Sequence, residues 1–283
     1  MKTLPHTTFG ADPTKPTLYF GHANAYPPEA YRQLINPLLE DHQVISYLQR
    51  GLWQPSPHIN TIKSWHDLAD DVIRFFDQQE LKNVIGVGHS LGAVTSFLAA
   101  QKRPDLFKAL VMIEPVVFSR AFCGMNAIMP KYVKKKVPII NKALNRPDQW
   151  ENKKQAFAFH RRARAFKRVS DAVLWDFIED GVVPKGNHLT LRYPKIWEAK
   201  CYASVTYFRN QLLTSKLPIL AFRGKHTDTV PADFWQKWQG NPNHQLVECA
   251  DASHLLPLER PEWLTPQIKQ FIDAQNQKQR HAA

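Results

Sequence analysis

The 283-residue sequence has few cysteines and no long apolar segment, and both shortages narrow the class of protein. Its three cysteines (Cys123, Cys201 and Cys249) form no CxxC pair, which argues against a disulfide framework and favours a reducing compartment. No run approaches the ~18 apolar residues of a membrane-spanning helix, and residues 1–6 lack the apolar core of a signal peptide. We therefore expect a cytoplasmic protein.

Internal repeats and metal-binding motifs such as HExxH are also missing. Glycine is scarce, with 11 residues against 21 prolines, which indicates many element boundaries without flexible low-complexity linkers. Hydrophobic residues make up 43% of the chain, as in a globular protein with a sizeable core. We expect neither a metal nor an organic cofactor.

Positive charge is concentrated in one segment. Residues 131–168 contain thirteen lysines and arginines but only Asp148 and Glu151, so they hold nearly all of the net charge of +12. A solvated outer face of helices is one interpretation, and a weak attraction to anionic surfaces is another. Specific nucleic-acid binding is not expected, because the chain shows no nucleic-acid-binding fold and no basic groove with interleaved aromatic residues.

Strand and helix patterns alternate along the first part of the chain. Strands are predicted at residues 17–23, 43–48, 83–88 and 109–113, and helices at 65–80 and 91–101. Later, two strands (217–222 and 245–249) precede a closing helix at 262–275. This order predicts an α/β fold with a mostly parallel central sheet flanked by helices.

The interval between these two parts differs in character. It is basic and rich in helix-forming residues and tryptophan, and it lacks convincing β-runs. One or two helices are predicted at 152–177 and another at 193–208. Helices inserted between two strands of one sheet predict a helical cap at residues 118–212 on a core formed by 1–117 and 213–283.

The sequence Gly88-His89-Ser90-Leu91-Gly92 matches the pattern Gly-x-Ser-x-Gly and lies between a predicted strand and a predicted helix. This pattern makes a sharp strand-to-helix turn that presents the serine hydroxyl above the sheet. Glycine is required at both ends because a β-carbon there would collide with the neighbouring strand and helix. The backbone N–H of the following residue, Leu91, faces the forming oxyanion at the helix N-terminus. Ser90 is therefore the predicted nucleophile.

A serine is a weak nucleophile that needs a base. His254 follows the last predicted strand and precedes the last helix, which puts it at the C-terminal edge of the sheet, where open α/β sheets bind ligands. The other histidines fall in terminal segments, polar loops or helix faces, and we expect them to be solvated. His254 is the predicted base.

With these motifs in place, the chain resembles the α/β-hydrolase superfamily, especially lidded bacterial serine hydrolases of the esterase type. The matching segments are FGHANAYP (20–27), GHSLG (88–92), MIEP (112–115), LAFRGKHTD (220–228) and ASHLLPLERPE (252–262). The resemblance implies cleavage of a small carboxylic ester or acyl compound by a Ser-His-acid triad through an acyl-enzyme. A thioesterase, an amidase, a carbon–carbon bond hydrolase and a non-catalytic ligand-binding protein remain alternatives.

The resemblance leaves two candidates for the triad acid. Superfamily members usually carry it after the strand that is here 217–222, three residues after a glycine and four before a proline. Counting from Gly224 and from Pro231 gives Thr227 both times, and Asp228 lies one position later. Other members take the acid from the end of the strand after the nucleophile helix, where this chain has Glu114. We favour Glu114, because a carboxylate at the end of a buried central strand is costly unless it is paired.

The resemblance also leaves two candidates for the second oxyanion donor. Superfamily members usually carry His-Gly-x after the first strand, whereas this chain reads Gly21-His22-Ala23-Asn24-Ala25-Tyr26. Alignment on His22 makes Asn24 the donor, which we favour. Alignment of Asn24-Ala25 with His-Gly makes it Tyr26.

Overall fold

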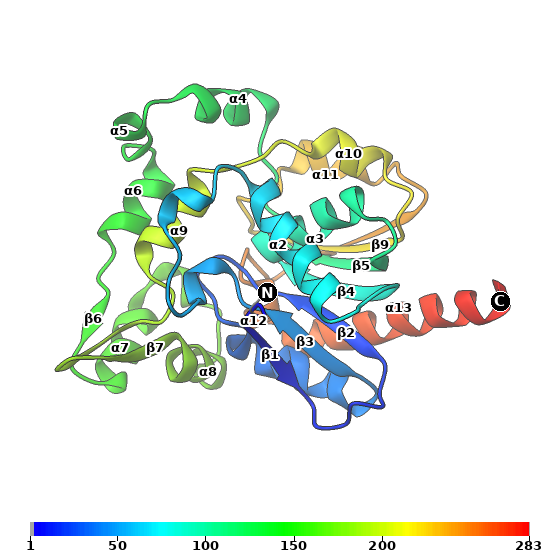
Figure 1. Ribbon diagram of the computed structural model, residues 1–283, viewed down its shortest axis with the longest axis horizontal. Helices are drawn as coiled ribbons and strands as arrows, with labels where there is room; N and C mark the ends of the chain where they lie inside the picture. The colour runs from blue at the N-terminus through cyan, green and yellow to red at the C-terminus, as the bar shows by residue number, and fades with distance from the viewer. Residues whose placement is uncertain (1–2, 283) are drawn as a thin grey trace.

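A seven-stranded sheet forms the centre of the computed structural model, which describes residues 3–282 (Figure 1). Its strands lie in the order β1-β3-β2-β4-β5-β9-β10. Their bounds are β1 His6–Phe9, β2 Thr17–Gly21, β3 Gln43–Tyr47, β4 Val84–His89, β5 Phe107–Ile113, β9 Ile219–Gly224 and β10 His244–Cys249. Every neighbouring pair is parallel except β1 with β3. The predicted mostly parallel sheet is confirmed, with β1 as an additional antiparallel edge strand.

Helices cover both faces of this sheet because side chains alternate along each strand. Leu110 and Met112 of β5 pack into one buried cluster with helices α2 (Trp65–Gln78) and α3 (Leu91–Lys102). Val111 and Ile113 point to the opposite cluster, which includes residues of α1, α12 and α13. The remaining core helices are α1 Arg32–Ile35, α10 Arg209–Thr214, α11 Ala232–Trp238, α12 Leu256–Glu259 and α13 Pro261–Ala282. Among the residues described, none of the helices is both long and apolar enough to cross a bilayer.

Six helices between β5 and β9 form most of the predicted cap. They are α4 Arg120–Ile128, α5 Lys131–Lys134, α6 Pro138–Asn145, α7 Lys153–Arg162, α8 Asp171–Gly181 and α9 Lys195–Tyr202. In Figure 1, α4, α5 and α6 lie along the outer edge of the molecule, on the side opposite the end of α13. The division into a cap (118–212) and a core stays a prediction, and α10 runs across its second boundary.

The segment also contains a small antiparallel sheet that the sequence analysis did not predict. Its order is β6-β8-β7, with β6 at Gln149–Trp150, β7 at Val182–Lys185 and β8 at His188–Leu191. Strands of two to four residues are too short to show an alternating pattern, and Pro184 argues against a strand. The expectation of a purely helical cap is therefore wrong at this point.

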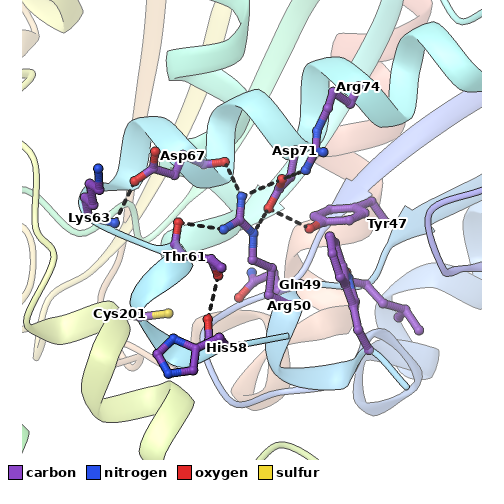
Figure 2. Close-up of polar contacts among 12 residues, drawn as sticks. Tyr47, Gln49, Arg50, His58, Thr61, Lys63, Asp67, Asp71, Arg74 and Cys201 are labelled. Carbon is purple, nitrogen blue, oxygen red and sulfur yellow. Dashed lines mark hydrogen bonds and ion pairs between the residues drawn. The ribbon is translucent and has the colours of Figure 1, made fainter. Parts of the chain in front are cut away.

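A buried carboxylate fixes the loop that follows β3 (Figure 2). The side chain of Asp71, on α2, is fully buried, and its Oδ1 accepts a hydrogen bond of 2.8 Å from Arg50 Nη2. Tyr47 Oη donates to Asp71 Oδ2 at 3.1 Å, and Arg74 also pairs with this carboxylate. These contacts hold Arg50, and with it the neighbouring Gln49, against the core of the sheet.

We expect Asp71→Ala to lower the free energy of unfolding by about 3–5 kcal/mol, because it leaves the largely buried guanidinium of Arg50 without its partner. The matched control is Asp70→Ala on the same helix, since that carboxylate is half exposed and pairs with Lys102 at the surface. The control should cost at most about 1 kcal/mol. Urea denaturation monitored by circular dichroism measures both, and equal losses would contradict the structural role of Asp71.

Candidate active site

The turn between β4 and α3 has the geometry of a nucleophile elbow. Ser90 has φ 54°, in the left-handed region that non-glycine residues rarely adopt, and its N–H donates to Ile113 O at 3.0 Å. A β-carbon added at Gly92 would lie 2.1 Å from Gly21 O, and one at Gly88 would lie 2.7 Å from the backbone of Ala93. Both glycines are therefore required, and the contact between Gly92 and Gly21 brings the end of β2 against the start of α3.

The histidine predicted as base lies next to this serine. His254 follows β10, and its Nε2 is 3.0 Å from Ser90 Oγ. Ser90 is only 5% exposed, whereas the side chain of His254 is partly accessible. The two residues lie 164 positions apart in the sequence, and the fold brings their side chains within hydrogen-bond distance.

Of the two candidate acids, Glu114 lies beside His254. Glu114 follows β5 with φ 48° and is fully buried, and its Oε2 is 3.2 Å from His254 Nδ1. Its Oε1 accepts a hydrogen bond from Gly224 N–H at 2.5 Å. The neighbouring strands β5 and β9 end side by side, with Ile113 opposite Phe222, which explains how a carboxylate after β5 reaches the histidine.

Two threonines after β9 complete the surroundings of this carboxylate. Thr227 Oγ1 donates to Glu114 Oε2 at 2.5 Å, and Thr229 Oγ1 donates to the same oxygen at 2.8 Å. Thr229 Oγ1 is also 2.9 Å from His254 Nδ1. Thr227 occupies the position at which superfamily members usually carry the acid. In this protein the Thr227 hydroxyl instead donates a hydrogen bond to Glu114, the carboxylate that follows β5.

Asp228, the other candidate, has an exposed side chain. Within residues 3–282, the side-chain partners of His254 are Ser90, Glu114 and Thr229. The structure therefore brings Glu114, and not Asp228, to the imidazole. The one-residue offset that the count revealed turns Asp228 toward solvent.

The structure also distinguishes between the candidate oxyanion donors by the hydrogen bonds of their backbone N–H groups. Within residues 3–282, the backbone N–H groups of Leu91 and Asn24 have no protein acceptor. Tyr26 N–H instead donates to Ala23 O at 3.2 Å, and its ring lies against Phe166 and Phe177 of the cap. This geometry favours Asn24 over Tyr26 as the second donor.

A buried histidine shapes the loop that carries Asn24. His22 Nδ1 donates to Ala23 O at 2.9 Å, and its Nε2 accepts from Gln49 N–H at 3.1 Å. Gln49 Nε2 also donates to His22 O at 2.6 Å. Burial lowers the pKa of His22 to about 4, which agrees with a neutral ring that donates at one nitrogen and accepts at the other. The Arg50–Asp71 pair thus supports this loop through Gln49.

His89, the residue before the serine, is a second buried histidine that sequence reasoning missed. Its Nε2 donates to His254 O at 2.8 Å, and its Nδ1 accepts from Tyr31 Oη at 2.8 Å. Tyr31 Oη in turn accepts from Ala23 N–H at 3.3 Å. Burial, and then the nearby His254, hold the pKa of His89 well below its usual range. His89 therefore links the serine turn, the histidine loop and the loop of Asn24.

The prediction of solvated histidines is wrong for these two residues and for three others. His42, His160 and His244 are also buried. Their positions in the sequence were the available signal, because His89 directly follows the predicted strand at 83–88 and His22 lies near the end of the predicted strand at 17–23. A polar residue at the end of a buried strand needs a partner, which is the argument that singled out Glu114.

The cap contacts the loop of Asn24 directly. Asn24 Nδ2 donates to the backbone oxygen of Glu198 on α9 at 3.1 Å. Glu198 is itself nearly buried, and its Oε2 lies 3.0 Å from Arg146 Nη2. Burial raises the pKa of the Glu198 carboxyl. The hydrogen bond between Asn24 and Glu198 thus joins α9 to the loop of Asn24.

Comparison with known proteins places this fold in a family. Residues 16–261 match the alpha/beta hydrolase fold family. The uncharacterized hydrolase YugF of Bacillus subtilis is 24% identical over 273 residues, which cover 92% of this chain and 91% of YugF. The karrikin insensitive 2 receptor IA of Petunia hybrida is 28% identical over 100 residues, so the match spans only 36% of that receptor.

A solved structure shows the same fold. The hydrolase of E-2-(acetamidomethylene)succinate superimposes with a TM-score of 0.76 at 22% identity, covering 95% of this chain and 93% of the other. A hydrolase is the class of protein that these similarities support. The match over residues 16–261 extends across most of the sequence, and the chain belongs to the alpha/beta hydrolase fold family.

Proposed function

We propose that the protein is a serine hydrolase that cleaves a carboxylic ester of a small molecule with the triad Ser90, His254 and Glu114. The observation that carries the proposal is one continuous set of contacts. Ser90 Oγ lies 3.0 Å from His254 Nε2, and His254 Nδ1 lies 3.2 Å from Glu114 Oε2. These distances match the reach that a nucleophile, its base and an orienting carboxylate require.

In the first half of the reaction, His254 Nε2 accepts the hydroxyl proton while Ser90 Oγ attacks the ester carbonyl carbon. Negative charge develops on the carbonyl oxygen, toward which the N–H groups of Leu91 and Asn24 donate. The C–O bond to the alcohol then breaks, and His254 gives its proton to the leaving oxygen. Ser90 is left as an acyl ester.

In the second half, water takes the place of the alcohol. His254 removes a proton from this water as its oxygen attacks the acyl carbon, and the same N–H groups stabilise the second tetrahedral intermediate. The bond to Ser90 Oγ breaks, Ser90 regains its proton from His254, and the carboxylic acid leaves. Throughout, the Glu114 carboxylate accepts from His254 Nδ1–H, which stabilises the imidazolium and keeps Nε2 directed at Ser90.

The hydrogen bonds of Glu114 support its role as the residue that orients His254. Four donors converge on its two oxygens: Gly224 N–H, the hydroxyls of Thr227 and Thr229, and His254 Nδ1. The name of the petunia receptor suggests that that protein binds a ligand. For this chain, the complete set of contacts from Ser90 to Glu114 favours catalysis over ligand binding alone.

Three substrates that share one short acyl group and differ only in the scissile bond test the reaction class. We expect kcat/KM to be highest for the p-nitrophenyl ester, lower for the matching thioester and lowest for the anilide. Mass spectrometry after rapid quenching should find the acyl group on the peptide that contains Ser90. A clear preference for the thioester or the anilide would overturn the ester assignment while leaving the nucleophile in place.

A further inference from the structure

Among the residues whose exposure is described, the exposed large hydrophobic side chains all lie in the predicted cap. Among the described residues these are Met125 on α4, Ile128 at its end, Tyr132 on α5, Ile139 on α6 and Ile196 on α9, and their exposed fractions run from 40% to 85%. Single exposed apolar residues are common on protein surfaces, but here they are confined to one set of helices. Met125 and Ile128 are three positions apart on α4 and so share one face of it.

Six lysines lie on or directly after the helices that carry these apolar side chains. Lys131, Lys135 and Lys136 are exposed, and Lys134, Lys142 and Lys200 lie on the same helices. Within residues 3–282, none of these six lysines forms an ion pair, whereas Lys153 and Lys195 elsewhere in the cap do. Burial, and then repulsion from Lys134 and Lys131, lower the pKa of Lys200, which shows that these positive charges lie close together. Among the described residues, no carboxylate lies within ion-pair distance of these lysines.

The helices that carry this surface are fastened to the rest of the cap. Ile140 and Ala143 of α6 pack on Ala199 of α9. Asn126 Nδ2 and Lys134 Nζ both donate to Ala203 O, at 3.2 Å and 3.1 Å, and tie α4 and α5 to the end of α9. Ile139 and Ile196 therefore project from the outer sides of a packed pair of helices. Figure 1 shows α4, α5 and α6 at the outer edge of the molecule, away from the sheet.

We propose that this surface, which we define as Met125, Ile128, Tyr132, Ile139 and Ile196 with Lys131, Lys135 and Lys136, binds the surface of an anionic lipid membrane. A membrane interface presents phosphate groups to the lysines and an acyl boundary to the apolar side chains, and it is the surface that needs both kinds of residue together. A nucleic acid offers phosphates too, but it has no site for exposed isoleucine and methionine, and it stacks on aromatic rings instead.

The proposal concerns where the protein works and does not depend on the reaction at Ser90.

Co-sedimentation with vesicles tests the proposal on the full-length chain. We expect strong binding to phosphatidylcholine vesicles that contain phosphatidylglycerol and weak binding to phosphatidylcholine alone. Binding should fall as salt rises, since screening shortens the Debye length from about 10 Å at 0.1 M to about 3 Å at 1 M. The triple variant Lys131→Gln, Lys135→Gln, Lys136→Gln should bind on the order of 100-fold more weakly, at roughly fivefold per lysine.

The matched control removes three exposed charges from another part of the same segment: Lys154→Gln, Lys167→Gln, Arg168→Gln. It lowers the net charge equally and should keep most of the binding. The double variant Ile128→Ser, Tyr132→Ser keeps every charge and should lose binding by on the order of tenfold, because it removes the apolar contact.

Three results would overturn the proposal. One is equal binding to both kinds of vesicle. Another is an equal loss in the two triple variants, which would mean that net charge alone acts. The third is a concentration-dependent dimer in light scattering that disappears in the double Ser variant, which would assign this surface to a second copy of the chain.

Discussion

Replacing Ser90 with alanine is expected to lower kcat for ester hydrolysis on the order of 10⁶-fold, because the acyl-enzyme can no longer form. A fluorophosphonate reagent should label the wild-type protein once and should not label the variant. The measurements are initial rates with a p-nitrophenyl ester and intact-protein mass spectrometry. The change removes one oxygen from a nearly buried side chain, so the thermal unfolding curve should stay close to that of the wild type.

Ser119→Ala provides the matched control. Ser119 is exposed and caps the start of α4, far along the chain from the elbow, and its variant should keep both activity and labelling. Retained activity or labelling in Ser90→Ala would remove Ser90 from the mechanism, whatever the distances in the structure.

The second large effect concerns the acid. Glu114→Gln should lower kcat/KM on the order of 10⁴-fold. The amide of glutamine has no negative charge to stabilise the imidazolium. In addition, its NH2 group is a donor, whereas all four groups around the side chain are donors that need an acceptor: Gly224 N–H, the hydroxyls of Thr227 and Thr229, and His254 Nδ1.

Asp228→Asn makes the same carboxylate-to-amide change one position after Thr227 and serves as the control. Because Asp228 is exposed, we expect kcat/KM within about twofold of wild type. Rates with the same p-nitrophenyl ester decide between the two residues. A large loss in Asp228→Asn together with a small loss in Glu114→Gln would reassign the acid.

The sequence predicted the sheet and the positions of Ser90 and His254 because each rests on a local pattern. Apolar runs of strand length identify β4, β5 and β9, and the Gly-x-Ser-x-Gly turn demands a particular backbone shape that few residues permit. The contact between Gly92 and Gly21 shows that demand physically, since no side chain fits between the two segments.

The acid was harder to predict because its location depends on how two loops meet. The count along the loop after β9 reached Thr227, a residue that turns out to bind Glu114 with its hydroxyl. Only the pairing of β5 with β9 brings the end of one strand beside the loop of the other. That proximity is a property of the assembled sheet and has no signature in either segment alone.

The supporting network was missed for the same reason. His89 bonds to Tyr31 and to His254, which lie 58 and 165 positions away, and Gln49 reaches His22 across 27 positions. The three short strands of the cap were missed because two to four residues cannot establish a period. Hydrogen-bond partners that are distant in the sequence, and strands of only a few residues, can be identified only from the three-dimensional structure.

The bonds made by His89 couple three loops that would otherwise fluctuate independently. Ala23 N–H, Tyr31 Oη, the imidazole of His89 and the carbonyl of His254 form one uninterrupted chain of hydrogen bonds. A displacement of the turn at Ser90 relative to either of the other two loops would stretch or break one of these bonds. The network therefore opposes relative movement of the nucleophile, the base and the loop of Asn24.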